Sequence, residues 1–368
     1  MMRANRARRA PAPAAGDCLD NRALMLKPPD NPPPAPPAHL DAFDGWRGLA
    51  ILLLLAGHFV PVPGINLGAL GVNFFFVLSG WLMTRLLFVQ LTPVDLFYRR
   101  RISRIVPAHI CFVALVTLGL LAASRPFEMT EVLDAAFFVN NYLGTDPAHA
   151  LPPLGHIWSL SVEEHSYVLL SLVALASRAR RINPVAVLGA LALACAACAV
   201  TYSLLFNDPQ RLYGLWLHTE VAGYGIFVSG MLMLVFSRHP PPRAPVALVL
   251  ALLLAGFALH WWSVPLAVQK ILGVGALALA VNLLPFVGGR LPVLLAWAPL
   301  RLLGLWSFSL YLWQQPFYLW SRSGAMSTGA GLACAFAAGL ASYYLLERPA
   351  RELLNRRWRG PATVAAAG

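Results

Sequence analysis

Long apolar stretches dominate the chain from Trp46 onward and restrict its fold more than any other sequence feature. About ten such stretches follow one another, separated by short polar segments. A helix of roughly 20 residues crosses a hydrocarbon core of about 30 Å. In lipid only helices or closed barrels satisfy their backbone, and the stretches lack the alternation of barrel strands. The sequence therefore predicts an all-α protein, a polytopic membrane helical bundle of about ten transmembrane helices.

The composition agrees with this interpretation. Of 368 residues, 58% are hydrophobic and 12% are charged, whereas an ordinary soluble domain has about 45–50% apolar and about 25% charged residues. The net charge of +12 would favour nucleic-acid binding only on a folded soluble face. Here the charges lie between apolar stretches, so no nucleic acid is expected as a partner. The expected spans are residues 46–62, 68–90, 106–123, 157–176, 185–206, 213–236, 244–262, 264–287, 300–320 and 326–346.

Basic residues are divided unequally between the two sides of the predicted bundle. Counted over alternate connections and span ends, 24 of the 28 Lys and Arg residues lie on one side. The positive-inside rule places that side, with both termini, in the cytoplasm. The sequence thus predicts a multi-pass protein of a cell inner (plasma) membrane.

The chain is expected to have three parts. Residues 1–39 are basic and proline-rich, which predicts a disordered cytoplasmic arm able to touch membrane lipids. Residues 40–350 form the membrane domain, and residues 351–368 a short basic cytoplasmic tail. The connection 124–156 is expected to form an outer lid. The five cysteines have no spacing that indicates a disulfide framework, and no metal is expected.

Ionisable residues inside a span are costly in lipid and mark candidate functional sites. The first span carries Arg47 and, eleven residues later, His58, which lies about 16 Å further along a helix. Each residue also has a structural alternative. Arg47 suits a snorkelling anchor at the inner surface, and His58 suits a helix-end histidine bonded to a neighbour.

Arginines and paired acids provide two further candidates. In the inner loop LFYRRRISRIVP, Arg101 and Arg104 are i,i+3 neighbours on one helical face. Guanidinium forks suit phosphates, so this loop predicts a place for a phosphorylated cytoplasmic donor; topology and lipid binding remain alternatives. Glu163 and Glu164 lie at the entry to the fourth span. They either stabilise the N-terminus of the helix through its dipole or provide a carboxylate for proton transfer.

Polar residues in the sixth and ninth spans complete the candidates. Gln314 and its neighbour precede Pro316, and a proline frees backbone groups, which suggests the polar lining of a cavity. His218 and Glu220 fit a pocket lining and a helix pairing equally well. The residues predicted to line a substrate pocket are Asp44, Trp158, Glu164, Tyr311 and Gln314.

Six motifs follow one another between about Leu40 and Arg351: FDGWRG…GHF, GVNFFFVLSGWLMT, FYRRRISRIVP, HIWSLSVEE, SFSLYLWQQPF and LLERPAR. One of them alone is a weak signal, whereas all six in this order are specific. With these motifs the chain resembles the acyltransferase family 3 of integral-membrane O-acyltransferases. That family includes bacterial O-antigen and exopolysaccharide acetylases and macrolide acylases.

The resemblance implies roles for five residues. The essential Arg-x10-His pair of the family corresponds to Arg47 and His58. Its Arg-x-x-Arg motif corresponds to Arg101 and Arg104, which would bind the donor, and the acid of its WSLxxE motif to Glu163.

The chain departs from the commoner family pattern at two places. His165-Ser166-Tyr167 stands where Gln-Phe-Tyr is more frequent, and Gln314-Gln315 stands where His-Trp often occurs. These departures leave the acceptor open.

The resulting hypothesis is an O-acyltransferase that moves an acetyl or other short acyl group from acyl-CoA to a hydroxyl. The acceptor would be a sugar, a glycan such as a polysaccharide or lipopolysaccharide, or a glycosylated small molecule. His58 would act as general base or accept the acyl group transiently, Glu163 would orient it, and Arg47 would steady the donor. No permanently bound cofactor is expected, since acyl-CoA is a substrate.

Two other classes fit a bundle of this kind. Polar residues in about ten spans also suit a transporter or flippase for a lipid-linked or glycan substrate. The absence of an internal repeat in the sequence disfavours that class. A non-catalytic membrane scaffold would leave His58 and Glu163 unexplained.

Overall fold

A computed structural model describes residues 41–60, 62–143 and 152–359, all of which belong to the compact unit that begins at His39. The predicted arm, residues 1–39, lies outside the described residues, as do parts of the expected lid and tail. Apart from turns and two isolated β-bridges, the described residues are helical and contain no strand.

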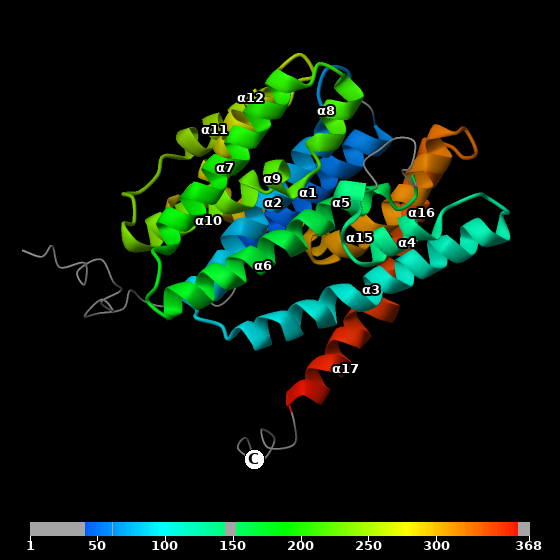
Figure 1. Ribbon diagram of the computed structural model, residues 1–368, viewed down its shortest axis with the longest axis horizontal. Helices are drawn as coiled ribbons and strands as arrows, with labels where there is room; N and C mark the ends of the chain where they lie inside the picture. The colour runs from blue at the N-terminus through cyan, green and yellow to red at the C-terminus, as the bar shows by residue number, and fades with distance from the viewer. Residues whose placement is uncertain (1–40, 61, 144–151, 360–368) are drawn as a thin grey trace, which may run out of the picture. The chain divides into compact units, whose positions relative to one another are not determined.

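Eleven helices of more than eight residues build the bundle (Figure 1). They are α1 (Asp41–Phe59), α2 (Leu67–Thr84), α3 (Val94–Ala122), α6 (Trp158–Arg178), α7 (Pro184–Leu205), α10 (Tyr224–Arg238), α11 (Val246–Ala258), α13 (Val274–Leu283), α15 (Ala298–Arg322), α16 (Thr328–Ser342) and α17 (Arg348–Arg359). The shorter helices are α4 (Met129–Ala136), α5 (Asn140–Leu143), α8 (Pro209–Leu215), α9 (Thr219–Ala222), α12 (Leu266–Val268) and α14 (Arg290–Leu295). The 3₁₀ turns are η3 (Gly155–Ile157) and η5 (Leu284–Phe286), and the π-helical turns are η2 (Arg85–Val89), η4 (Gln269–Gly273) and η6 (Tyr343–Glu347).

All ten expected spans overlap helices of the structure, so the predicted all-α membrane bundle is confirmed. Among the described residues, six helical stretches are long and apolar enough to cross a membrane, judged by length and composition. These are Leu67–Val89, Val94–Ala122, Pro184–Leu205, Thr219–Arg238, Leu266–Phe286 and Thr328–Trp358. The number of ten crossings stays a prediction.

Side-chain caps define several helix beginnings. Asn66, Asn183, Asp208 and Ser327 each accept a hydrogen bond from a backbone amide in the first turn of the helix that follows. Such caps satisfy amide groups that have no partner inside the helix. Local capping residues therefore determine where α2, α7, α8 and α16 begin.

Close helix packing characterises the centre of the bundle. Helix α1 packs against α15 and α2. A Cβ atom on Gly48 would collide with the carbonyl oxygen of Leu300, and one on Gly304 with that of Asp44. Small residues allow helix backbones to approach in membranes, and here they bring the polar faces of α1 and α15 into contact.

Two groups of helices flank this centre (Figure 1). In one group α10 contacts α2, α7 and α13, and α11 contacts α13. In the other group α16 packs on α15, and the long α3 contacts α17. Helix α6 contacts α2, so the centre is enclosed on several sides.

One segment differs from the sequence prediction. The arginine-rich segment, expected as an inner loop, forms the first turns of α3, which begins at Val94 and continues through Pro107. A hydropathy pattern misses this part because it is polar, although Asp95 in the first turn favours a helix start. The expected tail begins inside α17, which extends to Arg359.

Candidate active site

A cavity of about 250 Å³ lies among α1, α2, α3, α6 and α15. Most of the apolar lining comes from α2, and most of the polar lining comes from the other four helices. The polar and charged lining residues are Arg47, Ser79, Thr92, Arg100, Arg101, Arg104, Ser159, Glu163, Tyr167, Ser307 and Tyr311. The cavity therefore joins four of the residues predicted as functional (Arg47, Arg101, Arg104 and Glu163) and Tyr311 of the predicted pocket.

The arginines of the cavity are held by defined partners. Arg47 donates to the Ser307 hydroxyl at 3.0 Å. Arg101 donates to Glu164 Oε1 at 2.5 Å, and its guanidinium lies 3.7 Å from the ring centroid of Tyr167. These contacts fix the direction of two guanidinium groups at the cavity wall.

Arg104 is held by a buried acid that is not among the functional residues predicted from the sequence. Its Nε lies 3.8 Å from Oε1 of Glu347, whose side chain is 1% exposed. The other carboxylate oxygen of Glu347 accepts a hydrogen bond of 2.8 Å from Ser309. The only signal for Glu347 in the sequence is its place in the LLERPAR motif.

Glu163 lines the cavity from α6. It accepts hydrogen bonds from Ser79 at 2.7 Å and from Tyr167 at 3.0 Å. The expected contact between Glu163 and His58 is not made. Glu163 instead supports Tyr167, on whose ring Arg101 rests.

His58 belongs to a second polar group, beyond the cavity along α15. Its Nδ1 lies 2.7 Å from Oε1 of the buried Gln314. The Gln314 amide nitrogen donates to Gln315 at 3.2 Å, which turns the Gln314 oxygen towards His58. An amide oxygen only accepts, so Nδ1 carries the proton in the neutral ring and Nε2 keeps its lone pair.

Two neighbours complete the surroundings of His58. The ring stacks on Tyr318 with centroids 4.6 Å apart. Its Nε2 edge faces Gly68, where an added Cβ would come within 3.5 Å of the nitrogen. Because Gly68 has no side chain, this residue does not cover the Nε2 edge of the imidazole.

The spacing of these residues explains why both lie against α15. Eleven residues are about three helical turns, so Arg47 and His58 share one face of α1. Their partners Ser307 and Gln314 are seven residues apart, about two turns, and share one face of α15. The residue numbers of both partners increase from the first pair to the second, so α1 and α15 run in the same direction.

Tyr311 lies between the cavity and the His58 group. It lines the cavity, and Gln314 follows it one turn later on the same helix. Its hydroxyl lies 2.6 Å from the Ser159 hydroxyl and also donates to the backbone carbonyl of His156. This bridge ties α15 to the start of α6.

The remaining predicted pocket residues take other positions. Glu164 pairs with Arg101, and Trp158 packs edge-on against Phe76 with ring centroids 5.8 Å apart. Asp44 lies in the first turn of α1, and its carbonyl is the one that faces Gly304. Neither Trp158 nor Asp44 is among the residues that line the cavity.

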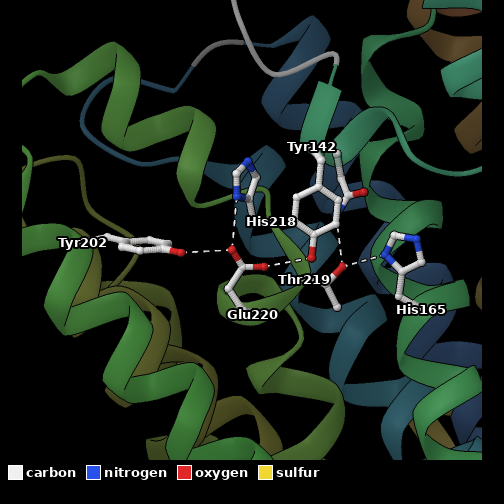
Figure 2. A network of polar contacts seen from close by, with 7 residues as sticks. Tyr142, His165, Tyr202, His218, Thr219 and Glu220 are labelled. Atoms are coloured by element: carbon white, nitrogen blue, oxygen red, sulfur yellow. Dashed lines mark hydrogen bonds and ion pairs between the residues drawn. The ribbon is translucent and has the colours of Figure 1, made fainter.

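A separate polar network surrounds Glu220 (Figure 2). Its carboxylate accepts from Tyr142 at 2.8 Å and Tyr202 at 3.1 Å, and lies 3.2 Å from Nδ1 of His218. His165 bonds the nearby Thr219 hydroxyl at 2.8 Å (Figure 2). These bonds connect α5, α6, α7 and α9, so Glu220 pairs helices as one of the two sequence interpretations expects.

The fold and the site define a helical membrane protein that has an arginine-lined cavity and a His–Gln pair. A family model described as an acyltransferase domain matches residues 40–348. The chain therefore belongs to this acyltransferase family, and the resemblance seen in the six motifs is confirmed. Membership makes the protein an acyltransferase with an acyl donor and an acceptor. No solved structure matches the chain at a significant level.

Two relatives illustrate the similarity. A Komagataeibacter xylinus protein provisionally named membrane-bound transacylase BcsY is 31% identical over 362 residues, which cover 88% of this chain and 87% of the relative. The O-acetyltransferase OatA of Staphylococcus aureus is 30% identical over 194 residues. That match covers 48% of this chain and only 32% of OatA.

Proposed function

We propose that the protein is a membrane O-acyltransferase that transfers an acetyl or other short acyl group from an acyl-CoA to a hydroxyl of a sugar, a glycan or a glycosylated small molecule. The observation that carries the proposal is the arginine-lined cavity that reaches Tyr311 of α15, one helical turn before the Gln314 that bonds His58. The names of the two relatives, a transacylase and an O-acetyltransferase, support the same class of reaction.

The charge of the cavity supports a phosphorylated donor. Four arginines line it, and Glu163 is the one carboxylate among its described lining residues. Arg100 is exposed, and Arg104 keeps 34% of its side chain accessible, so guanidinium groups are available at the rim. Arginine forks bind phosphate oxygens with directed hydrogen bonds. The donor phosphates accordingly bind at Arg100, Arg101 and Arg104.

The size of the cavity supports entry of only the narrow part of the donor. Its volume of about 250 Å³ lies below the roughly 300–1,000 Å³ of pockets that enclose a whole ligand. The nucleotide of an acyl-CoA stays at the rim, and the thioester arm enters between Arg47 and Glu163. Tyr311 turns aside to admit the acyl group to His58.

His58 supplies the reactive nitrogen. Gln314 holds the proton on Nδ1 and leaves the Nε2 lone pair free. As a base, Nε2 takes the acceptor hydroxyl proton while the oxygen attacks the thioester carbon. The carbon–sulfur bond breaks, and the CoA thiolate takes up the proton. As a nucleophile, Nε2 first receives the acyl group itself.

The proposed topology places the donor in the cytoplasm. The positive-inside rule puts both termini and the arginine end of α3 on the cytoplasmic side of an inner membrane. His58 lies at the opposite end of α1 from Arg47, so the acceptor approaches nearer the other face. No permanently bound cofactor or metal takes part in this scheme.

The test uses the purified protein in lipid nanodiscs with acetyl-CoA labelled in the acetyl group. The membrane fraction of the source cells supplies hydroxyl acceptors. We expect release of CoA that depends on those membranes, with the label in an ester that mild alkali cleaves. Arg47→Ala should lower this transfer by at least about tenfold, since it removes a charged contact worth about 1.5–3 kcal/mol. Arg125→Ala, at an exposed residue outside the cavity, serves as the control.

Two results would contradict the proposal. Movement of lipid or glycan across the bilayer without CoA release would favour the transporter or flippase class. Equal loss of activity in the Arg47 and Arg125 variants would show that the cavity has no special part in transfer.

A further inference from the structure

Arg351 is a basic residue of α17 to which the proposed mechanism gives no role. Helix α17 packs against α3, the helix that carries Arg100, Arg101 and Arg104 (Figure 1). Its neighbour Arg348 pairs with Glu352 at 3.0 Å. The Arg351 side chain, in contrast, makes no ion pair and no hydrogen bond with any other side chain that the structure describes. Its guanidinium group is therefore available to a ligand.

The exposure of α17 shows which face of the helix packs on the protein. Positions 348, 349, 352, 353, 356 and 357 are exposed. The half-buried positions recur with the helical period and are Ala350, Arg351, Leu354, Asn355 and Trp358. Arg351 therefore belongs to the packed face of α17 and not to its solvent face.

Two contacts on that face show what Arg351 lies beside. Glu347, four residues earlier, holds Arg104 of α3, with Oε1 and Nε 3.8 Å apart. Asn355, four residues later, accepts a hydrogen bond of 3.4 Å from Ser103 of α3. Residues four apart are neighbours on a helix surface. Arg351 thus lies between two contacts that both reach α3 at the arginines of the cavity.

Arg351 adds a third guanidinium group to the rim of the cavity. Arg100 and Arg104 line the cavity and lie about one turn apart on α3. Among the described residues, Glu347 is the one acid that pairs with any of these three arginines. The charges of Arg104 and Arg351 repel each other, in agreement with their placement. The rim therefore suits a ligand that carries several negative charges.

The place of Arg351 indicates which part of such a ligand it meets. Arg351 is not among the residues that line the cavity, so it lies on the outer side of the rim. In an acyl-CoA the diphosphate is joined directly to the thioester arm, whereas the 3′-phosphate lies on the ribose, farther from that arm. With the arm in the cavity, the diphosphate meets the lining arginines and the 3′-phosphate stays outside them.

We propose that Arg351 binds the 3′-phosphate of the donor and makes the protein selective for CoA thioesters over thioesters that lack this phosphate. This inference rests on the proposed function, because it names a further residue of the same donor site. A phosphate monoester carries close to two negative charges near neutral pH, about −1.5 to −2. A guanidinium fork donates two parallel hydrogen bonds to its oxygens. Helix α17 is then a wall of the donor site.

The experiment measures donor binding separately from acyl transfer, with the full chain in phosphatidylcholine nanodiscs. Isothermal titration calorimetry gives the Kd of CoA and of 3′-dephospho-CoA. We expect the wild type to bind 3′-dephospho-CoA about 10- to 100-fold more weakly than CoA, the range for a lost charge-assisted hydrogen bond. In Arg351→Gln the two Kd values should agree within about threefold, because the partner of the phosphate is gone.

Acetyl transfer to acceptor membranes provides a second readout. In Arg351→Gln the KM for acetyl-CoA should rise by about 10- to 100-fold, while kcat stays within about twofold, since Arg351 meets neither the thioester nor the acceptor. Arg351→Lys keeps the charge without the fork and should give an intermediate KM. Arg357→Gln, at an exposed arginine on the solvent face of α17, serves as the matched control and should keep the wild-type preference.

Three results would overturn the inference. Equal binding of CoA and 3′-dephospho-CoA by the wild type would show that the 3′-phosphate is not recognised. An unchanged preference in Arg351→Gln with a normal melting temperature would assign that phosphate to other residues. A melting temperature that phosphatidylglycerol raises in the wild type but not in Arg351→Gln, with an unchanged CoA preference, would assign Arg351 to a lipid headgroup.

The two readouts distinguish this inference from the proposed function. The expected phosphate preference in a protein that transfers no acetyl group would support Arg351 as a nucleotide-binding residue and refute the proposed acyl transfer. Acetyl transfer with equal use of acetyl-CoA and its 3′-dephospho form would support the proposed function and refute the role of Arg351.

Discussion

The Gln314→Leu substitution tests the orientation of His58 most specifically. Leucine has a similar volume but accepts no hydrogen bond, so Nδ1 of His58 loses the partner at 2.7 Å that holds its proton. Gln314 is fully buried, and water therefore replaces the lost acceptor poorly. An unsatisfied buried donor costs about 1–3 kcal/mol.

That cost sets the expected effect on the rate. At about 1.4 kcal/mol for each factor of ten, it corresponds to a decrease of about 5- to 150-fold in kcat. The donor KM should stay within about threefold, because Gln314 is not among the cavity residues that the proposal assigns to the donor. Gln314→Glu, whose carboxylate accepts from Nδ1 more strongly, should retain more activity than Gln314→Leu.

The assay is the initial rate of CoA release at varied acetyl-CoA concentration in the presence of acceptor membranes. Asn282→Leu provides a matched control, since Asn282 is also a buried amide, bonded to Ser229 at 3.0 Å in another part of the bundle. It should lower the melting temperature without changing kcat of the folded protein. An unchanged kcat in well-folded Gln314→Leu would refute the argument that this bond prepares His58.

Three other substitutions have definite expectations. Arg104→Lys keeps the charge but loses the planar fork beside Glu347, so the donor KM should rise by about three- to thirtyfold with little change in acceptor KM; the reverse pattern would contradict donor binding there. Gly304→Ala places a Cβ against the carbonyl of Asp44, and this overpacking should destabilise the bundle by at least about 1–3 kcal/mol, seen as an earlier thermal transition. Lys270 is buried, and its described contacts are Asn73 Oδ1 at 3.0 Å and the Trp216 ring, neither of which is anionic. Lys270→Met should therefore leave thermal stability unchanged or raise it by about 1–4 kcal/mol; a large loss would show that the charge has a compensating partner in the folded protein.

The helices were largely predictable from the sequence because apolar length is a local property. Segments such as 185–206 and 264–287 coincide closely with α7 and with the α12–α13 stretch. The first turns of α3 were missed because arginines lower the local hydropathy, while the helix itself depends on contacts with α17 and η6. Hydropathy reports which residues prefer lipid, and it does not report where a helix extends beyond the apolar part.

The residues of the candidate site were also partly predictable. Motif spacing selected Arg47, Arg101 and Glu163, which line one cavity. The partner of His58 was predicted wrongly, because the sequence gives the depth of a residue along its helix but not which faces of distant helices meet. Glu163 is directed to Ser79, and His58 is directed to Gln314.

Some contacts of the candidate site could not be recognised from the sequence. Ser307, which accepts the hydrogen bond from Arg47, and Ser79 are small polar residues inside motifs otherwise read as apolar helix. Their importance comes from the partner across the interface rather than from their own chemistry.

The most direct test of the central claim is a cryo-electron microscopy structure with a non-reactive acetyl-CoA analogue in which a methylene group replaces the thioester sulfur. The account predicts phosphates beside Arg100, Arg101 and Arg104, and the arm in the cavity between Arg47 and Glu163. It also predicts that Tyr311 is displaced and that the acetyl carbonyl carbon lies about 3–3.5 Å from Nε2 of His58. An analogue bound outside this cavity, or one whose acetyl group lies more than about 10 Å from His58, would contradict it.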